Sequence, residues 1–285
     1  MPLNTSLARK RYPSTTFDVR ADEIQKYAAA TNEDNPRFTG DKPVAPPAFP
    51  IVAAASTLNE VLNDSDLGAN LARLIHGEQE HMLISLIEPG DSLTVETWLE
   101  AVEAGEDGES FTVATRLLKE GASAAELRGK MFIRGTAKRR PQRPNEPEET
   151  DSPEVIFSVT QKVDEDQASR YAEASGDDNP IHLDADFARN QAGLPGIILH
   201  GMCTMAFASK AVLDSVCDSD PNRLKRIKVR FARPVFPGES LTTEGWKKDE
   251  DEGRVVYGFV TTNSRGSAVL TDGEAEVSKK LSERI

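Results

Sequence analysis

Two side chains that can carry protons stand five positions apart in the segment GDDNPIH, residues 176–182: Asp177 and His182. Their free side chains titrate near about 4 and about 6.5, which suits both to proton transfer close to neutral pH. The glycine, asparagine and proline around them are turn formers, and a turn lets both side chains converge on one water molecule. The spacing indicates acid–base chemistry, although ordinary surface turns have the same composition. We interpret Asp178 as a solvated residue of this turn.

A second candidate lies downstream in LPGIILHGMCTMAF, where Gly201 stands at the expected start of a buried helix. A backbone N–H at a helix N-terminus has no partner within the helix and lies at the positive end of the helix dipole. Such a donor can stabilise an oxygen that becomes negative during a reaction. We expect the neighbouring His200 to cap the helix or pack at its start rather than to transfer a proton.

The sequence shows no pattern typical of a metal or nucleotide site. His182, Asp184 and His200 lack a spacing such as HExxH, and no calcium-binding loop is present, so we expect no metal. Phosphate loops of the GxGxxG and GxxxxGK[ST] types are also missing, so we expect no cofactor. Cys203 and Cys217 are too few for a disulfide framework, which favours reduced core residues in a cytoplasmic protein.

Net charge and hydropathy exclude several further classes of protein. The net charge of -13 disfavours general attraction to nucleic acid or to anionic membranes. No apolar run is long enough to span a membrane, and the first residues lack the apolar core of a secretory signal. The basic start weakly permits an organellar transit peptide, and the final ERI is not a peroxisomal address. We expect a soluble intracellular protein.

The chain repeats itself, which indicates how the candidate residues are positioned. YAAATNEDNPRF at 27–38 matches YAEASGDDNPIH at 171–182 in six of twelve positions. PGDSLTVETW at 89–98 matches PGESLTTEGW at 237–246 in seven of ten. Two matches in the same order at nearly equal offsets, 144 and 148, predict a duplicated domain. The boundaries that we predict are 1–140, a linker rich in proline and charge at 141–153, and 154–285.

Each half shows the same succession of elements. A short helical segment runs into the Asp-Asn-Pro turn, where the residue before proline helps to end the helix. An alanine-rich apolar segment follows, at 49–62 or 200–216, and predicts a buried helix. Alternating segments such as RIKVRFARPVF at 226–236 predict strands with short connections. This is an α+β fold in which an antiparallel sheet wraps a helix, once in each half.

The GDDNPIH segment, the downstream HGM and the strand RFARPVFPGESL together resemble the MaoC-like hydratases, also called (R)-specific enoyl-CoA hydratases or hydratase 2. The resemblance covers essentially the whole chain and implies a double hotdog fold with a degenerate first half and a catalytic second half. It implies reversible hydration of a trans-2-enoyl-CoA thioester by Asp177 and His182, with Asn179 orienting water or substrate and Gly201 as the oxyanion donor. Coenzyme A would enter only as part of the substrate.

The first half keeps the asparagine of this pattern as Asn35 but departs from it at the proton carriers and at the oxyanion donor. Glu33 stands opposite Asp177, Asn32 opposite Gly176, Phe38 opposite His182 and Phe49 opposite Gly201. Because phenylalanine cannot relay a proton, we expect this half to be catalytically empty. We expect Phe38, Phe49 and the stretch APPAFP to line an acyl pocket instead, and we assign His76 and His81 to packing.

Several alternatives stay open. The basic cluster Lys225, Arg226, Lys228, Arg230 and Arg233 either attracts the phosphates of coenzyme A or forms a solvated strand face. The same chemistry could act on an acyl-carrier-protein thioester or on a branched dicarboxylic acyl-CoA of the mesaconyl type. A hotdog acyl-CoA thioesterase and a binding subunit with an idle site are the further rivals. A homodimer is compatible with the resemblance but is not required by it.

Overall fold

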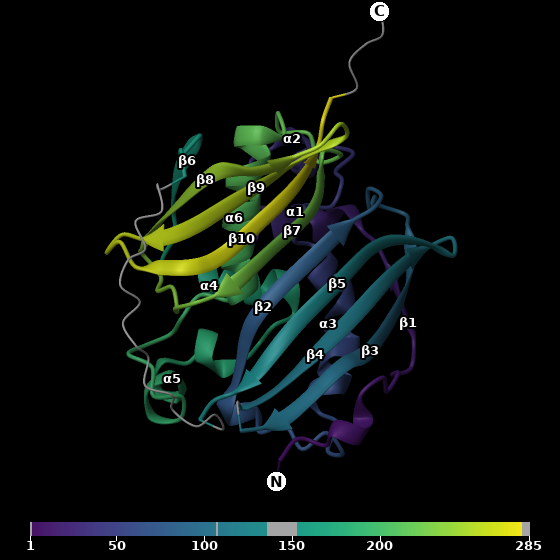
Figure 1. Ribbon diagram of the computed structural model, residues 1–285, viewed down its shortest axis with the longest axis vertical. Helices are drawn as coiled ribbons and strands as arrows, with labels where there is room; N and C mark the ends of the chain where they lie inside the picture. The colour runs from purple at the N-terminus through teal and green to yellow at the C-terminus, as the bar shows by residue number, and fades with distance from the viewer. Residues whose placement is uncertain (1, 107, 136–152, 281–285) are drawn as a thin grey trace, which may run out of the picture.

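A computed structural model describes residues 2–106, 108–135 and 153–280. Ten antiparallel strands form one sheet in the order β1-β3-β4-β5-β2-β7-β10-β9-β8-β6 (Figure 1). The first half supplies β1 (Thr15–Asp18), β2 (Leu74–Leu83), β3 (Ser92–Gly105), β4 (Gly108–Lys119) and β5 (Ala122–Ile133). The second half supplies β6 (Phe157–Lys162), β7 (Leu224–Phe231), β8 (Ser240–Glu250), β9 (Arg254–Asn263) and β10 (Ala268–Ser278). Read from either edge to the central β2–β7 pair, the strand order is the same, as expected of a duplicated domain.

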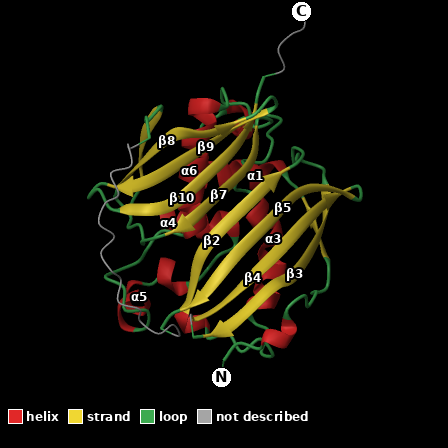
Figure 2. Cartoon of the chain, viewed as in Figure 1, coloured by secondary structure: helices red, strands yellow, loops and turns green. Residues whose placement is uncertain are grey.

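The helices lie on one face of this sheet (Figure 2). The first half contains α1 (Ala21–Ala30), α2 (Pro36–Thr39) and α3 (Pro50–Leu62), and the second half contains α4 (Gln167–Ser175), α5 (Ala185–Asn190) and α6 (Gly201–Val216). Short 3-10 turns occur at η1 (Thr5–Leu7), η2 (Leu71–Arg73) and η3 (Pro180–His182). Helix α3 packs on β3, β4 and β5, and α6 packs on β6, β7, β8 and β10. The α+β double hotdog prediction is confirmed, with a central helix enclosed by the sheet in each half.

The two central helices are buried to different extents. Eleven of the sixteen residues of α6 are buried, whereas α3 buries five of thirteen. The first half therefore has a helix face that the sheet does not cover completely. The predicted linker, apart from Pro153, lies outside the described residues, and its boundaries stay a prediction.

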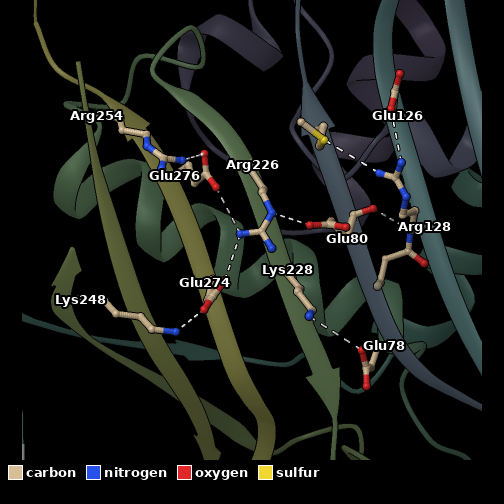
Figure 3. Close-up of polar contacts among 12 residues, drawn as sticks. Glu78, Glu80, Glu126, Arg128, Arg226, Lys228, Lys248, Arg254, Glu274 and Glu276 are labelled. Atoms are coloured by element: carbon tan, nitrogen blue, oxygen red, sulfur yellow. Dashed lines mark hydrogen bonds and ion pairs between the residues drawn. The ribbon is translucent and has the colours of Figure 1, made fainter. Parts of the chain in front are cut away.

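Three residues of the basic cluster, Arg226, Lys228 and Arg230, alternate along β7 with buried apolar residues and so lie on the sheet face opposite the helices, at the seam between the halves. The Arg226 guanidinium pairs with Glu80 of β2 and lies 3.0 Å from Glu274 and 3.4 Å from Glu276 of β10 (Figure 3). Lys228 faces Glu78 across the seam at 4.0 Å. Opposite charges on neighbouring strands stabilise a sheet. For these two residues the structure favours the strand-face interpretation over a phosphate site.

Candidate active site

The GDDNPIH segment forms a tight turn between α4 and η3. Gly176 ends α4 in the left-handed conformation at φ 76°, which glycine adopts without steric cost. The Asn179 side chain accepts a hydrogen bond from the backbone of Ile181 at 3.3 Å and so caps η3. The Asn179 backbone N–H in turn donates to Oδ1 of Asp177 at 3.3 Å. Asn179 therefore fixes the turn. Its side-chain NH2 remains for the predicted contact with water or substrate, which stays a prediction.

The turn brings Asp177 and His182 together, and His200 joins them. One side-chain oxygen of Asp177 and one ring nitrogen of each histidine lie within 4.8 Å of one another. The His182 side chain is 7% exposed, whereas Asp177 is exposed. The predicted pair is thus within reach of a shared water molecule.

Hydrogen bonding sets the tautomer of His182. Its Nδ1 lies 2.8 Å from the carbonyl oxygen of Ile198, and because a carbonyl only accepts, Nδ1 carries the proton. Burial lowers the pKa of His182, and the nearby Asp177 carboxylate only partly opposes this. The neutral ring therefore keeps a lone pair on Nε2, which can accept a proton near neutral pH.

His200 does more than we predicted from the sequence. It is the N-cap residue of α6 but makes no side-chain capping bond, so the capping prediction is wrong, whereas packing is confirmed. Its ring stacks on His182 with centroids 3.7 Å apart, and its Nε2–H donates to the Asp177 carbonyl at 3.0 Å. Burial, followed by the proximity of His182, lowers its pKa to about 4. A neutral His200 thus ties the start of α6 to the GDDNPIH turn, which was not evident from sequence because the two bonded residues are 23 positions apart.

Gly201 is the first residue of α6, as predicted. A Cβ atom there would lie 3.2 Å from the ring of Phe231, so glycine lets this ring approach the helix start. The N–H of Gly201 has no acceptor within the helix because it belongs to the first turn. Its role as an oxyanion donor stays a prediction.

The structure groups a different set of residues from the set that the sequence suggested as possible metal ligands. Asp184 caps α5 by accepting bonds from Asp186 and Phe187 and is not part of the cluster. The three grouped residues are Asp177, His182 and His200. Ring nitrogen lone pairs lie in the ring planes, so two stacked imidazoles inclined by 28° direct them nearly parallel rather than toward one ion. This geometry argues against a metal centre, and the absence of a bound metal stays a prediction.

A cavity of about 250 Å³ extends from the GDDNPIH turn into the first half. Asp177 and Asn179 lie in its wall, whereas His182 and Gly201 are not among its lining residues. The rest of the wall in the second half is Tyr171, Ser175, Gly176, Asp178 and Met202. The first half contributes Ile51, Ala55, Leu58, Asn59 and Leu62 of α3, His76 and Gln79 of β2, Val113 and Thr115 of β4, and Leu127, Gly129 and Met131 of β5. Both halves therefore build one cavity.

The prediction of which first-half residues line this cavity is wrong. Phe38 and Phe49 are fully buried in the core, and the Ala-Pro-Pro stretch borders a separate cavity of about 30 Å³. The side chains of α3 take their place because α3 turns a partly uncovered face toward the catalytic turn. His81 packs as predicted, with Nδ1 3.0 Å from the Pro47 carbonyl. His76 also packs as predicted, with its ring centroid 4.8 Å from that of Phe231 of β7, and in addition it lies in the cavity wall, which the sequence of β2 alone did not reveal.

The correspondence between the halves also shifts by one residue at the central helices. Helix α3 begins at Pro50 after the N-cap Phe49, and α6 begins at Gly201 after the N-cap His200. Gly201 is therefore the counterpart of Pro50, and His200 that of Phe49. The loops before the helices differ in length, so an ungapped alignment of the turns could not give this register.

Among the described residues, no helix has both the length and the apolar character needed to cross a membrane.

Comparison with known proteins identifies the family of both halves. Residues 147–268 match the family model described as "MaoC like domain", and residues 9–126 match "FAS1-like, dehydratase domain region". The chain is 31% identical over 243 residues to a 3-hydroxyacyl-thioester dehydratase Y of Mycobacterium tuberculosis, covering 81% of this chain and 78% of that protein.

Two further similar proteins match different shares of this chain. A probable enoyl-CoA hydratase 2 of Dictyostelium discoideum is 44% identical over 115 residues, 40% of this chain, and the match spans only 38% of that protein. The crystal structure of a MaoC-like dehydratase from Phytophthora capsici superposes with a TM-score of 0.82 at 27% identity, covering 99% of this chain and 100% of that one. Sequence and fold thus agree over both halves, and the chain belongs to the MaoC-like dehydratase family.

Proposed function

We propose that the chain is a hydro-lyase that adds water reversibly to a trans-2-enoyl-CoA and yields the (R)-3-hydroxyacyl-CoA. The observation that carries this proposal is the grouping of Asp177 and His182 within 4.8 Å where Asp177 enters the wall of the large cavity. Membership of the family, and relatives named as hydratases and dehydratases, support the reaction class.

The geometry supports specific roles in this reaction. Water binds between the Asp177 carboxylate and Nε2 of His182, and its oxygen attacks C3 while Nε2 accepts its proton. The electron pair of the C2–C3 double bond moves toward the thioester oxygen, where the N–H of Gly201 donates. His182 then returns the proton to C2 on the same face, while Asp177 stabilises the transient imidazolium. One water is consumed, and both groups end in their starting states.

The cavity is assigned to the acyl chain. Its first-half wall contains Ile51, Leu58, Val113, Leu127 and Met131, which suit hydrocarbon. An acyl group attached at the catalytic turn would therefore extend toward α3 and β4.

Two measurements on a panel of enoyl-CoA thioesters test the function. Hydration removes the absorbance of the conjugated enone without releasing a thiol, whereas thioester cleavage releases free coenzyme A. We expect the first signal alone. Thiol release as the main signal would favour the thioesterase alternative, and neither signal on any CoA or acyl-carrier-protein thioester would refute the proposal. A preference for carrier-protein-bound or branched dicarboxylic substrates would keep the chemistry and change the substrate.

A further inference from the structure

The wall of the acyl cavity contains hydrogen-bonding groups that a plain hydrocarbon chain would not use. Gln79 of β2 is 2% exposed and Thr115 of β4 is also 2% exposed, and both line the cavity. Buried polar groups cost free energy unless they are hydrogen-bonded. The hydrogen bonds that these residues already make determine what each can still offer to a ligand.

A chain of three threonines fixes the direction of the Thr115 hydroxyl. All three contacts can be hydrogen bonds only if Thr57 of α3 donates its single proton to the Ala54 carbonyl at 3.0 Å and accepts from Thr97, 2.7 Å away. Thr97 has then used its own proton and accepts from Thr115 at 3.0 Å. Thr115 is left with acceptor capacity only, and a ligand that bonds to it must bring a donor.

Gln79 offers the opposite capacity. Burial lowers the pKa of His76 to about 4, so the ring is neutral and carries one N–H. His76 Nε2 lies 2.9 Å from Oε1 of Gln79, and the Gln79 amide nitrogen makes one long contact of 3.4 Å to the Glu80 carbonyl. At least one amide N–H therefore lacks a good acceptor. Gly129 leaves room for this pair, because a Cβ there would lie 3.0 Å from Oε1 of Gln79.

The strand order places these groups in sequence along the cavity. Gln79 pairs with Gly129 of β5, which pairs with Val113 of β4, and Thr115 is two residues further along β4. With neighbouring strands about 4.8 Å apart and a rise of about 3.4 Å per residue, the backbones of Gln79 and Thr115 are separated by roughly 12 Å. The donor lies beside the seam with the catalytic half, and the acceptor lies deeper in the first half.

We propose that this cavity selects an enoyl group that carries a hydroxyl substituent, with Thr115 as its hydrogen-bond acceptor and Gln79 as a donor to an oxygen nearer the thioester. This inference rests on the proposed hydration of enoyl-CoA. A hydroxyl fits because it can donate to Thr115, whereas an alkyl chain leaves the acceptor capacity of Thr115 and one amide N–H of Gln79 unused. Sites built to bond a substrate hydroxyl discriminate strongly against the analogue that lacks it.

The test compares enoyl-CoA substrates of equal length with and without a hydroxyl, placed at successive carbons of the chain. We expect kcat/KM for the best hydroxylated substrate to exceed that of its plain analogue by at least about tenfold. Thr115→Val keeps the shape and removes the acceptor, so this ratio should fall toward one. Gln79→Leu should lower the ratio for substrates that carry their oxygen closer to the thioester.

Thr261→Val is the matched control. Thr261 forms the equivalent buried cross-strand pair with Thr243, 2.9 Å away, but neither residue lines the cavity. This variant should leave the substrate ratio at its wild-type value. A ratio near one for every hydroxyl position in the wild type, or equal losses on both substrates in Thr115→Val, would overturn the inference while leaving hydration intact. Absence of hydration for all thioesters would instead refute the proposed function.

Discussion

The two halves share a scaffold and differ in what occupies it. In the second half, Oδ1 of Asp177 accepts a bond from the backbone of Asn179, and in the first half Oε1 of Glu33 accepts the same bond from Asn35 at 3.0 Å. Each asparagine caps the turn that follows it. The local hydrogen bonds that shape the turn are therefore retained in both copies.

The residues to which we assign the chemistry occur in only one copy. Tyr27 packs its ring on Phe49 in the first half, where Tyr171 packs on His200 in the second. Pro50 begins α3 and has no N–H, whereas Gly201 begins α6 and has one. The first half therefore lacks both the histidine at the helix start and the backbone donor.

The acidic residue of the first half has gained a different partner. Glu33 is 8% exposed and lies 3.3 Å from Nζ of Lys210, on α6 of the other half. Burial raises the pKa of Glu33, and Lys210 opposes this shift. In the register of the helix starts, the α3 residue that corresponds to Lys210 is Asn59, which lines the cavity. One turn is closed by an ion pair between the halves and the other opens into the large cavity, so the two copies of the turn differ in their surroundings as the proposed division between packing and catalysis requires.

The strongest test of this difference between the halves is to remove each of the two proposed proton carriers, Asp177 and His182. Asp177→Asn and His182→Ala should each lower turnover by at least about two orders of magnitude, the usual size of effect for a lost proton carrier. Steady-state hydration kinetics, with circular dichroism to verify folding, measure this. Hydration near the wild-type rate in either folded variant would place the chemistry elsewhere.

Acid should destabilise both halves, because each contains two histidines whose surroundings favour the neutral ring. Burial lowers the pKa of His76 and His81 in the first half, each to about 4, and of His182 and His200 in the second. The unfolded chain therefore binds more protons between about pH 6.5 and pH 4, and the free energy of unfolding falls as the pH falls through that window.

His81→Asn isolates the first-half contribution. The amide N–H can replace Nδ1–H as the donor to the Pro47 carbonyl, and the titrating group is lost. The difference in unfolding free energy between pH 7 and pH 4, from urea titrations, should shrink by roughly 1 to 3 kcal/mol. An unchanged difference would mean that His81 does not stay neutral in the folded protein.

A smaller effect is expected from replacing His200 by phenylalanine, the residue that precedes the central helix in the first half. His200→Phe keeps an aromatic ring between Tyr171 and His182 but removes the bond to the Asp177 carbonyl. We expect kcat to fall about tenfold, the loss of one positioning hydrogen bond of roughly 1.4 kcal/mol, with KM little changed. His200→Asn, which can still donate to that carbonyl, should restore part of kcat, and equal melting temperatures would exclude a general loss of structure.

The sequence predicted features that depend on local pattern and missed those that depend on long-range packing. The turn, the helix start at Gly201 and the duplication follow from turn residues, apolar periodicity and repeated segments. The cavity wall could not be predicted in this way, because it depends on how far α3 stands from β2, β4 and β5. The same limit applies to His76 and His200, whose neighbours are distant in the chain. Phe38, which corresponds to His182, predicts that the first half lacks a proton carrier. It does not predict which first-half residues line the cavity.

The smallest effect should come from the carboxylate of the empty half. Glu33→Gln retains an oxygen that can accept the bond from Asn35, and Lys210 still has Asp34 and Asp214 as partners, the latter at 3.1 Å. We therefore expect kcat within about twofold of the wild type and a change in unfolding free energy below about 1 kcal/mol. Glu33 thus serves as the matched counterpart of Asp177, because the two residues occupy equivalent turns and differ in whether an acid–base partner stands beside them. A collapse of kcat in Glu33→Gln comparable to that in Asp177→Asn would show that the first half takes part in the chemistry and would end the division of labour between the halves.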